Sequence, residues 1–222
     1  MNSDYRKANK LSDEVLLCAE SIKSFPFSIE EVIKECTDIE LVQYSELRKL
    51  GGNAEMIVGS KDGALHENNG RYILFYNEAM PKSRSLFTLG HELGHYQFGH
   101  DIKTLDEYKR NHDERFKELY DKCEKEANLF SAQLYTPYQV IKELAKRGCK
   151  ITTEFLQEHF GVSNQCAKVR ISNLCYQKNG EYDDLILAKF KHFIDTTAKR
   201  TSSFSDEFER EYEMQRLREP WN

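Results

Sequence analysis

The stretch His91-Glu92-Leu93-Gly94-His95 lies within a clear helical pattern of this 222-residue chain. Leucines recur around it at three- and four-residue intervals, so we predict a helix over residues 82–98, beginning directly after Pro81. Side chains four residues apart on a helix lie about 40° apart around its axis and about 6 Å apart along it. Two imidazoles with this spacing can reach one zinc ion, which histidine nitrogens bind at about 2.0–2.1 Å. The pattern therefore predicts His91 and His95 as metal ligands on a central helix.

The glutamate next to the first histidine gives this pattern its chemistry. On a helix, Glu92 points to the side of the ion where a water molecule would bind. Zinc lowers the pKa of such a water, and a nearby carboxylate can take its proton as it attacks a polarised carbonyl. A surface helix can carry the same letters by chance, but glycines at 90 and 94 leave room for close packing or a metal. We predict Glu92 as the general base of a zinc-dependent hydrolase.

A zinc hydrolase needs a third protein ligand and an open fourth position. A ligand at Asp101 would follow the metzincin spacing, but that pattern requires a glycine where this chain has Phe98. His100 falls one residue short of the same position, so we interpret both as polar groups at a helix end. The third ligand is expected on a later amphipathic helix that stops before Pro137.

Two glutamates on that later helix compete for the role. Glu124 and Glu126 flank its apolar stripe on opposite sides by about 80° each, so helical phase does not choose between them. Glu124 shares its side with Asn128 and Ser131, which are the better lining for a polar cleft. Asn128 is also placed to orient a ligand histidine. In the alternative interpretation, both glutamates are solvated charges on an exposed edge.

The composition excludes several classes of protein. The chain is 39% hydrophobic and 31% charged, which is typical of a globular protein rather than a disordered one. Its net charge of −5 gives no overall attraction to nucleic acid or to an anionic membrane. It has neither a signal-like N-terminus nor an apolar run of membrane-spanning length, so we expect a cytoplasmic protein without a membrane partner. Six cysteines without a CxxC pair predict reduced, mostly buried thiols.

Apart from these motifs, the pattern predicts an α+β fold with a small, mostly antiparallel sheet. Ser12 is the expected cap of a first helix, and Ser28 and Glu31 form a capping box that begins a second. Strands are predicted at 39–42, 55–58 and 71–76, and the charged segment 101–122 as a solvated helix or surface insertion. Shorter helices fit 138–147, 153–160 and 163–175. We expect a peptidase domain over 1–137, a helical region over 138–200 and a polar extension over 201–222.

Two blocks of sequence carry a family resemblance. The first is Arg84-Ser85-Leu86-Phe87-Thr88-Leu89-Gly90-His91-Glu92-Leu93-Gly94-His95-Tyr96, preceded by Tyr76-Asn77, and the second runs from Glu124-Lys125-Glu126-Ala127-Asn128 to Pro137. Together they resemble the ImmA/IrrE metallopeptidases. This resemblance implies that Glu124, the first glutamate of the second block, is the third zinc ligand and that Asn128 supports a ligand. Ser131 and Tyr135 replace the family's usual alanine and leucine, which indicates changes of packing only.

The resemblance also implies a function. Members of this family are bacterial proteins that cleave helix-turn-helix repressors or relieve their repression. We therefore expect limited proteolysis of a protein substrate, such as a helix-turn-helix repressor of a mobile element or stress response. The alternative is a transcriptional regulator or binding module that uses the C-terminal helical region, with a vestigial metal site.

The helical region resembles the small region that follows the peptidase core in this family. Its second helix carries Lys168 and Arg170, but Glu154 and Glu158 counter their charge, so DNA binding is not expected. The oligomeric state stays open.

Several other polar side chains have ordinary interpretations. Tyr135 and Tyr138 are possible oxyanion donors, but packing is the expected role of both. His159 and His192 lack a partner at ligand spacing and are expected to make ordinary polar contacts.

Overall fold

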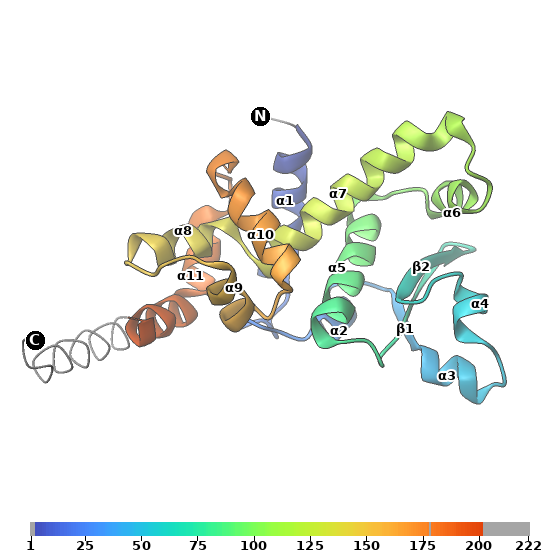
Figure 1. Ribbon diagram of the computed structural model, residues 1–222, viewed down its shortest axis with the longest axis horizontal. Helices are drawn as coiled ribbons and strands as arrows, with labels where there is room; N and C mark the ends of the chain where they lie inside the picture. The colour runs from blue at the N-terminus through green and yellow to red at the C-terminus, as the bar shows by residue number, and fades with distance from the viewer. Residues whose placement is uncertain (1–2, 178, 202–222) are drawn as a thin grey trace, which may run out of the picture.

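The computed structural model describes residues 3–177 and 179–201, and its architecture is α+β, as predicted (Figure 1). Helices α5 (Lys82–Phe98) and α7 (Lys117–Tyr135) lie at the centre of the molecule. A small sheet lies on one side of them and the C-terminal helices on the other. The two helices that carry the motifs therefore link the two halves of the molecule.

The sheet is mixed and has three strands in the order β1-β3-β2. The edge strand β1 (Glu40–Gln43) pairs in parallel with the central strand β3 (Arg71–Tyr76), and β2 (Gly63–Asn68) pairs antiparallel with β3. A two-residue turn at Asn69-Gly70 joins β2 to β3, and both residues have positive φ, at 53° and 78°. These angles belong to a type I′ turn, whose twist matches that of the flanking strands.

The predicted strand over 55–58 is wrong. These residues form the short helix α4 (Ala54–Val58), because Asn53 caps its start by accepting a hydrogen bond from the Met56 amide. Gly59 ends the helix in the left-handed conformation, with φ at 74°. Over so short a segment, the Asn53 cap and the helix-ending Gly59 outweigh the preference of Ile57 and Val58 for a strand. The helix α3 (Tyr44–Lys49) precedes it.

The expected start of the first helix is also wrong. Helix α1 spans Ser3–Cys18, and Ser12 lies fully buried in its middle. The Ser12 hydroxyl lies 2.8 Å from the carbonyl oxygen of Ala8 and 2.9 Å from that of Phe130 in α7, so it joins two helices instead of capping one. The next helix, α2 (Ile29–Cys36), does begin at the predicted cap, because Ser28 accepts from the Glu31 amide.

Close approach of α5 and α7 depends on two glycines. A Cβ atom at Gly90 would lie 2.5 Å from the Tyr135 ring, and one at Gly94 would lie 3.0 Å from the Ala127 Cα. Only glycine allows the backbones to come this close at these positions. The sequence-based boundaries of α5, residues 82–98, are confirmed.

The charged segment between α5 and α7 is helical. Asp101 caps α6 (Ile102–Asn111) by accepting from the Thr104 amide, and a short 3-10 turn, η1 (Glu114–Phe116), leads into α7. Buried Ile102 and Leu105 attach α6 to the core, and α6 lies above β2 (Figure 1). The outer side of α6 is solvated, as predicted, and its inner side packs against the rest of the molecule.

The C-terminal helices pack onto α1 and α7. They are α8 (Tyr138–Lys146), α9 (Thr153–Phe160), α10 (Asn164–Asn173), the 3-10 turn η2 (Leu174–Tyr176), α11 (Asp183–Lys189) and a helical segment over 191–201. The three predicted short helices are confirmed to within three residues at each end. One hydrophobic core runs across residue 137, so the domain boundary stays a prediction. The predicted extension, apart from its first residue, lies outside the described residues.

A buried polar network holds these helices to α1 and α7. The amides of Gln133 and Gln139 donate to the Asp13 carboxylate at 2.9 and 2.8 Å, and the guanidinium of Arg170 donates to Gln133. The Tyr138 amide donates to the same Gln133 oxygen. The network joins α1, α7, α8 and α10 through groups that are all nearly inaccessible to water.

All six cysteines are free, as predicted. They are not mostly buried, however. Only Cys123 and Cys149 lie in the core, whereas Cys18 and Cys175 are exposed and the other two are half-buried.

Candidate active site

The site begins with the two histidines of α5, which lie one turn apart on the side that faces α7. Their Nε2 atoms are 3.0 Å apart. His95 is almost fully buried, and His91 lies at the edge of the cleft with its Nδ1 atom 3.1 Å from the Asn128 side-chain oxygen. An amide oxygen can only accept, so His91 donates from Nδ1 to Asn128 and its Nε2 is left with a lone pair.

The carboxylate of Glu124 reaches both histidines from α7. Its Oε2 lies 3.3 Å from the His91 Nε2, and its Oε1 lies 3.5 Å from the His95 Nε2. The sequence left Glu124 and Glu126 as alternatives by helical phase, and the geometry brings Glu124 to the histidine pair. Glu126 instead meets His100, 3.0 Å from its Nε2.

These three groups fit a tetrahedral divalent cation. Ligands at about 2.0–2.1 Å from a tetrahedral centre lie about 3.3–3.4 Å from one another, and the three separations here are 3.0, 3.3 and 3.5 Å. Moreover, the buried Oε1 of Glu124 accepts no hydrogen bond from any described residue. A carboxylate oxygen and imidazole nitrogens, gathered this closely, supply the donor set of a zinc site with one position left for water.

The electrostatics of the cluster agree with this fit. Burial raises the pKa of Glu124, but the adjacent His91 and His95 imidazoles outweigh burial and hold it well below its usual range. Burial lowers the pKa of His91, yet the Glu124 and Glu92 carboxylates raise it overall. The Glu124 carboxylate is therefore ionised, and the surrounding carboxylates favour a positive charge at His91. Both conditions favour a cation between these groups.

Glu92 is held by the sheet. It is 7% exposed, and its Oε2 accepts a 3.0 Å hydrogen bond from the backbone amide of Leu65 in β2. The Leu65 amide points away from β3, so by alternation Gly63 and Glu67 also direct their backbone groups to the outer edge of β2. One oxygen of the predicted base is therefore fixed, and the other remains available to the cleft.

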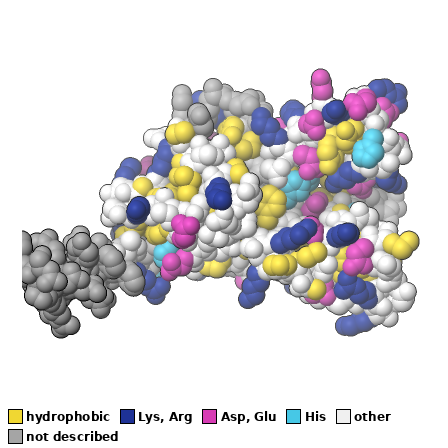
Figure 2. Space-filling model, viewed as in Figure 1, with side chains coloured by type: hydrophobic (Ala, Val, Ile, Leu, Met, Phe, Trp, Pro, Cys, Tyr) yellow, Lys and Arg dark blue, Asp and Glu magenta, His cyan; other side chains and the backbone are white. Residues whose placement is uncertain are grey.

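The cleft beside these residues has a volume of about 430 Å³. Its walls come from α5, α6, α7 and the segment from α4 into β2. They include His91, Glu92, Glu124 and Asn128 together with Val58, Gly59, Ser60, Asp62, Gly63, Ala64, Phe87, Thr88, Asp106 and Lys109. Figure 2 shows a hollow with a histidine side chain at its centre, between the helical part of the molecule and the part that carries the sheet.

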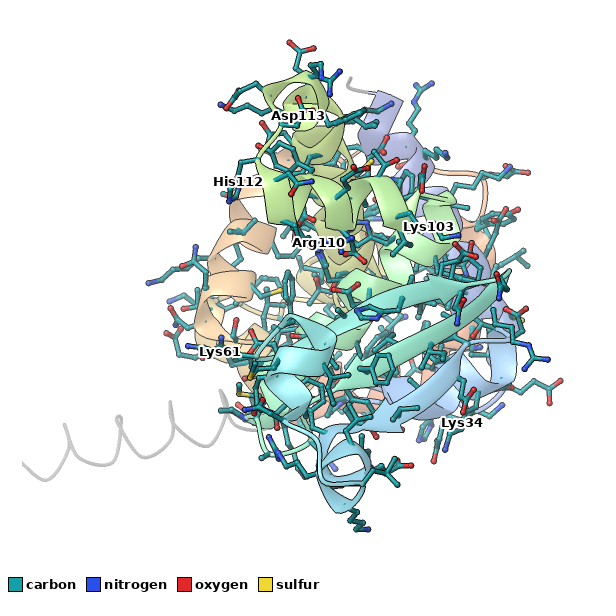
Figure 3. The ribbon with its side chains drawn as sticks, turned by 90° about the vertical axis from the view of Figure 1, so that its right-hand side faces the viewer. Lys34, Lys61, Lys103, Arg110, His112 and Asp113 are labelled. Atoms are coloured by element: carbon teal, nitrogen blue, oxygen red, sulfur yellow. The ribbon has the colours of Figure 1, made fainter. Side chains whose placement is uncertain are left out.

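Helix α6 forms the upper wall of this cleft. In Figure 3 it lies across the sheet, with Lys103 above the end of β2 and Arg110 further along the same helix. Lys103 Nζ lies 2.6 Å from the Glu67 carboxylate, and Lys109 Nζ lies 4.0 Å from Glu124 Oε1. The α6 wall therefore places a positive charge near the candidate ligands.

Sequence reasoning missed some of these contributors. Lys109 looked like part of a solvated charge run, and nothing in its spacing indicated that α6 folds back over the cleft. The contact between Glu126 and His100 was also not predicted. His100 is half-buried at a predicted helix end, and Glu126 is buried at the edge of the apolar stripe of α7. Asp101 caps α6 and takes no part in the histidine cluster.

Neither tyrosine proposed as an oxyanion donor reaches the cleft. The Tyr135 hydroxyl donates to the Leu86 carbonyl at 2.6 Å within the core, and the Tyr138 hydroxyl donates to Asp183. Both residues have the packing role that the sequence favoured.

Comparison with known protein families agrees with the two motifs. The sequence pattern of peptidase family M78, described as the IrrE N-terminal-like domain, matches residues 54–172, more than half of the chain. The chain belongs to the IrrE-like M78 peptidase family. The match spans β2, β3, the α5–α7 pair and the helices up to α10, so it contains the whole candidate site. A comparison with curated proteins found no match.

Membership of the M78 family makes this a peptidase-type chain with a protein substrate. Among residues 3–177 and 179–201, every helix is too short or too polar to cross a lipid bilayer.

Proposed function

We propose that the chain is a zinc-dependent endopeptidase that performs limited proteolysis of a regulatory protein. The observation that carries the proposal is the convergence of His91, His95 and Glu124 to within 4.8 Å of one another, beside Glu92 in a cleft. A structural zinc site closes all four positions with protein ligands, whereas this cluster offers three and opens onto the cleft.

In this proposal His91, His95 and Glu124 hold the ion and Asn128 orients His91. When bound, zinc would act as a Lewis acid and lower the pKa of a water molecule in the cleft. Glu92 takes the proton of that water on the oxygen that Leu65 does not bind, and then passes it to the leaving amine of the peptide. The Leu65 hydrogen bond keeps the carboxylate in one rotamer through both transfers.

The outer edge of β2 is the proposed docking site for the substrate backbone. The cleft includes Gly63 and Ala64. The backbone groups of Gly63 and the Leu65 carbonyl point away from β3, while the Leu65 amide stays bound to Glu92. A peptide lying there adds a strand to the sheet and is bound through its main chain. Such pairing accepts many sequences, so selectivity must come from the side-chain pockets and from the shape of the substrate.

Lys109 is the proposed source of charge opposite the developing oxyanion. It is exposed, lines the cleft and lies 4.0 Å from Glu124. The flexible side chain can bring its ammonium group close to a substrate carbonyl oxygen. A positive charge there stabilises a tetrahedral transition state.

The proposed substrate is a helix-turn-helix repressor, and the proposed role of residues 138–200 is to support or dock it. Family membership supports a protein substrate. Against direct DNA binding by α9 and α10, Arg170 is 4% exposed and donates to Gln133, so it is not free to contact phosphate or bases. Residues 1–137 then make up the catalytic part of the chain.

Cleavage of a purified candidate repressor tests the proposal. We expect the full chain to release two defined fragments by mass spectrometry, a chelator to stop cleavage and added zinc to restore it. Glu92→Gln should lower kcat by about 10²- to 10⁴-fold while zinc binding persists, because the amide cannot accept the proton.

Glu118→Gln is the matched control, since Glu118 is an exposed glutamate of α7 away from the cleft. Full relief of repression by the Glu92→Gln chain would contradict the proposal and indicate a regulator that acts without cleavage.

A further inference from the structure

A second pair of residues continues from the histidine cluster into the core. The Nδ1 atom of His95 lies 2.9 Å from the Nδ1 atom of His100, and the Nε2 atom of His100 lies 3.0 Å from Glu126 Oε2. Glu126 is 7% exposed, and its other oxygen has Lys122 Nζ at 3.9 Å. The contacts run from Glu126 through His100 to the Nδ1 atom of His95, across the ring from the Nε2 atom that faces Glu124.

Hydrogen-bonding rules fix the protons along this chain. A carboxylate only accepts, so His100 donates to Glu126 from Nε2. If His100 is neutral, its Nδ1 then carries a lone pair and accepts a hydrogen bond from the Nδ1–H of His95. His95 is left with its lone pair on Nε2, the atom that faces His91 and Glu124. Any other assignment puts a proton on the nitrogen that must bind the ion.

We propose that Glu126 and His100 are positioning residues that set the tautomer and ring orientation of His95 for metal binding. The inference rests on the proposed metal site and extends it to a carboxylate–histidine–histidine relay. It also gives the two ligand histidines separate supports, because Asn128 of α7 holds His91 in the same way from the outside. Such outer partners typically change metal affinity by about 10- to 100-fold.

The same residues have a competing interpretation. His100 and Glu126 also lie within 4.8 Å of the Cys123 thiol, so the three side chains have the donors of a second metal site. The two interpretations differ at His100: in the relay its Nε2 donates to Glu126 and its Nδ1 accepts from His95, so His100 has no lone pair left for a second ion.

Cobalt(II) and zinc titrations of the metal-free full chain against a chelating competitor test the relay. We expect one ion per chain for the wild type, and an affinity lower by about 10- to 100-fold for His100→Leu and Glu126→Leu. His100→Asn should recover most of the affinity, because its amide oxygen can accept from His95 near the position of the lost Nδ1. The exposed His192→Leu is the matched control. Unchanged affinity in His100→Leu overturns the relay.

A second readout needs no variant. Nitrogen-15 shifts of the wild-type imidazoles should show protons on His95 Nδ1 and His100 Nε2, with or without metal, and the opposite tautomer at either ring overturns the proposal. Two ions per chain, with one lost in Cys123→Ser, also overturn it. If the wild type binds no ion, the proposed metal site fails, while the shifts still decide the relay.

Discussion

Lys109 brings a positive charge to within 4.0 Å of Glu124, although it lies on a helix that carries no candidate ligand. We predict that Lys109→Met lowers kcat for peptide cleavage by about 10²- to 10³-fold and leaves zinc affinity nearly unchanged, because it removes charge stabilisation of the transition state. Lys103→Met is the control from the same helix, since Lys103 pairs with Glu67 away from the ligands. Equal kcat values for the two variants would remove Lys109 from the mechanism.

Asn128 supports His91 through a single hydrogen bond of 3.1 Å. Asn128→Leu removes the acceptor, and we expect zinc affinity to fall by about 10- to 100-fold in competition titrations. Asn128→Asp keeps an oxygen acceptor and should keep most of the affinity. Asp121→Asn, a change at an exposed residue of α7, is the control. Wild-type affinity in the leucine variant would mean that Asn128 does not support the ligand.

Among the helices, the α5–α7 contact is the one that sets the distance between the two motifs. Gly90→Ala would place a methyl group 2.5 Å from the fully buried Tyr135 ring. Alanine favours a helix by about 1 kcal/mol over glycine, but overpacking a core costs about 1–3 kcal/mol. We expect a net loss of up to about 2 kcal/mol in the free energy of unfolding, measured in urea.

The double variant Gly90→Ala with Tyr135→Leu tests the stated cause. The smaller leucine leaves space for the methyl group, so the two changes should be less destabilising together than the sum of their separate effects. If the two changes in unfolding free energy simply add, the cost of Gly90→Ala does not arise from its contact with Tyr135.

How far the sequence predicts these elements depends on whether local signals agree. Residues 82–98 combine a preceding proline with an apolar stripe, and the helix has those bounds. Ser12 looked like a cap, but its hydroxyl serves a contact with Phe130, which is 118 positions away in the sequence. Only the folded chain brings these two together.

The candidate site was predictable to the same extent. The His91–His95 spacing is a property of one helix, so the sequence alone identifies the pair. The choice between Glu124 and Glu126 depends on how α7 rotates against α5, which helical phase left open and the family resemblance indicated. The roles of His100, Leu65 and Lys109 depend on contacts between separate elements, and no local pattern encodes them.

In the molecule as a whole, the buried network around Asp13 couples stability to pH. Burial raises the pKa of Asp13 to about 6 from an ordinary value of 3.8, despite hydrogen bonds from Gln133 and Gln139. The folded state therefore holds this proton more tightly than the unfolded state does. Its contribution to stability is greatest below about pH 4, falls as pH rises toward 6 and is absent above that.

Asp13→Asn isolates this effect. Lowering the pH from 7.5 to 4 should raise the unfolding free energy of the wild type relative to the variant by up to about 3 kcal/mol, the free energy of the two-unit shift. Urea denaturation at several pH values measures the difference, and all other titrating groups cancel between the two chains. A difference that does not vary with pH would show that Asp13 titrates normally.

The α6 wall above β2 has a consequence for the kind of substrate that the proposed peptidase can accept. The cleft of about 430 Å³ is bounded by a strand edge and a helix, which suits an extended backbone better than an intact helix, about 10 Å wide with its side chains. If the substrate is a compact repressor, as we propose, it must open locally before cleavage or be cut in a linker between its folded parts. Under that proposal, local unfolding of the repressor would limit the rate of its cleavage, in addition to the chemical step. A signal that loosens such a repressor would then trigger its cleavage without any change in the M78 chain itself.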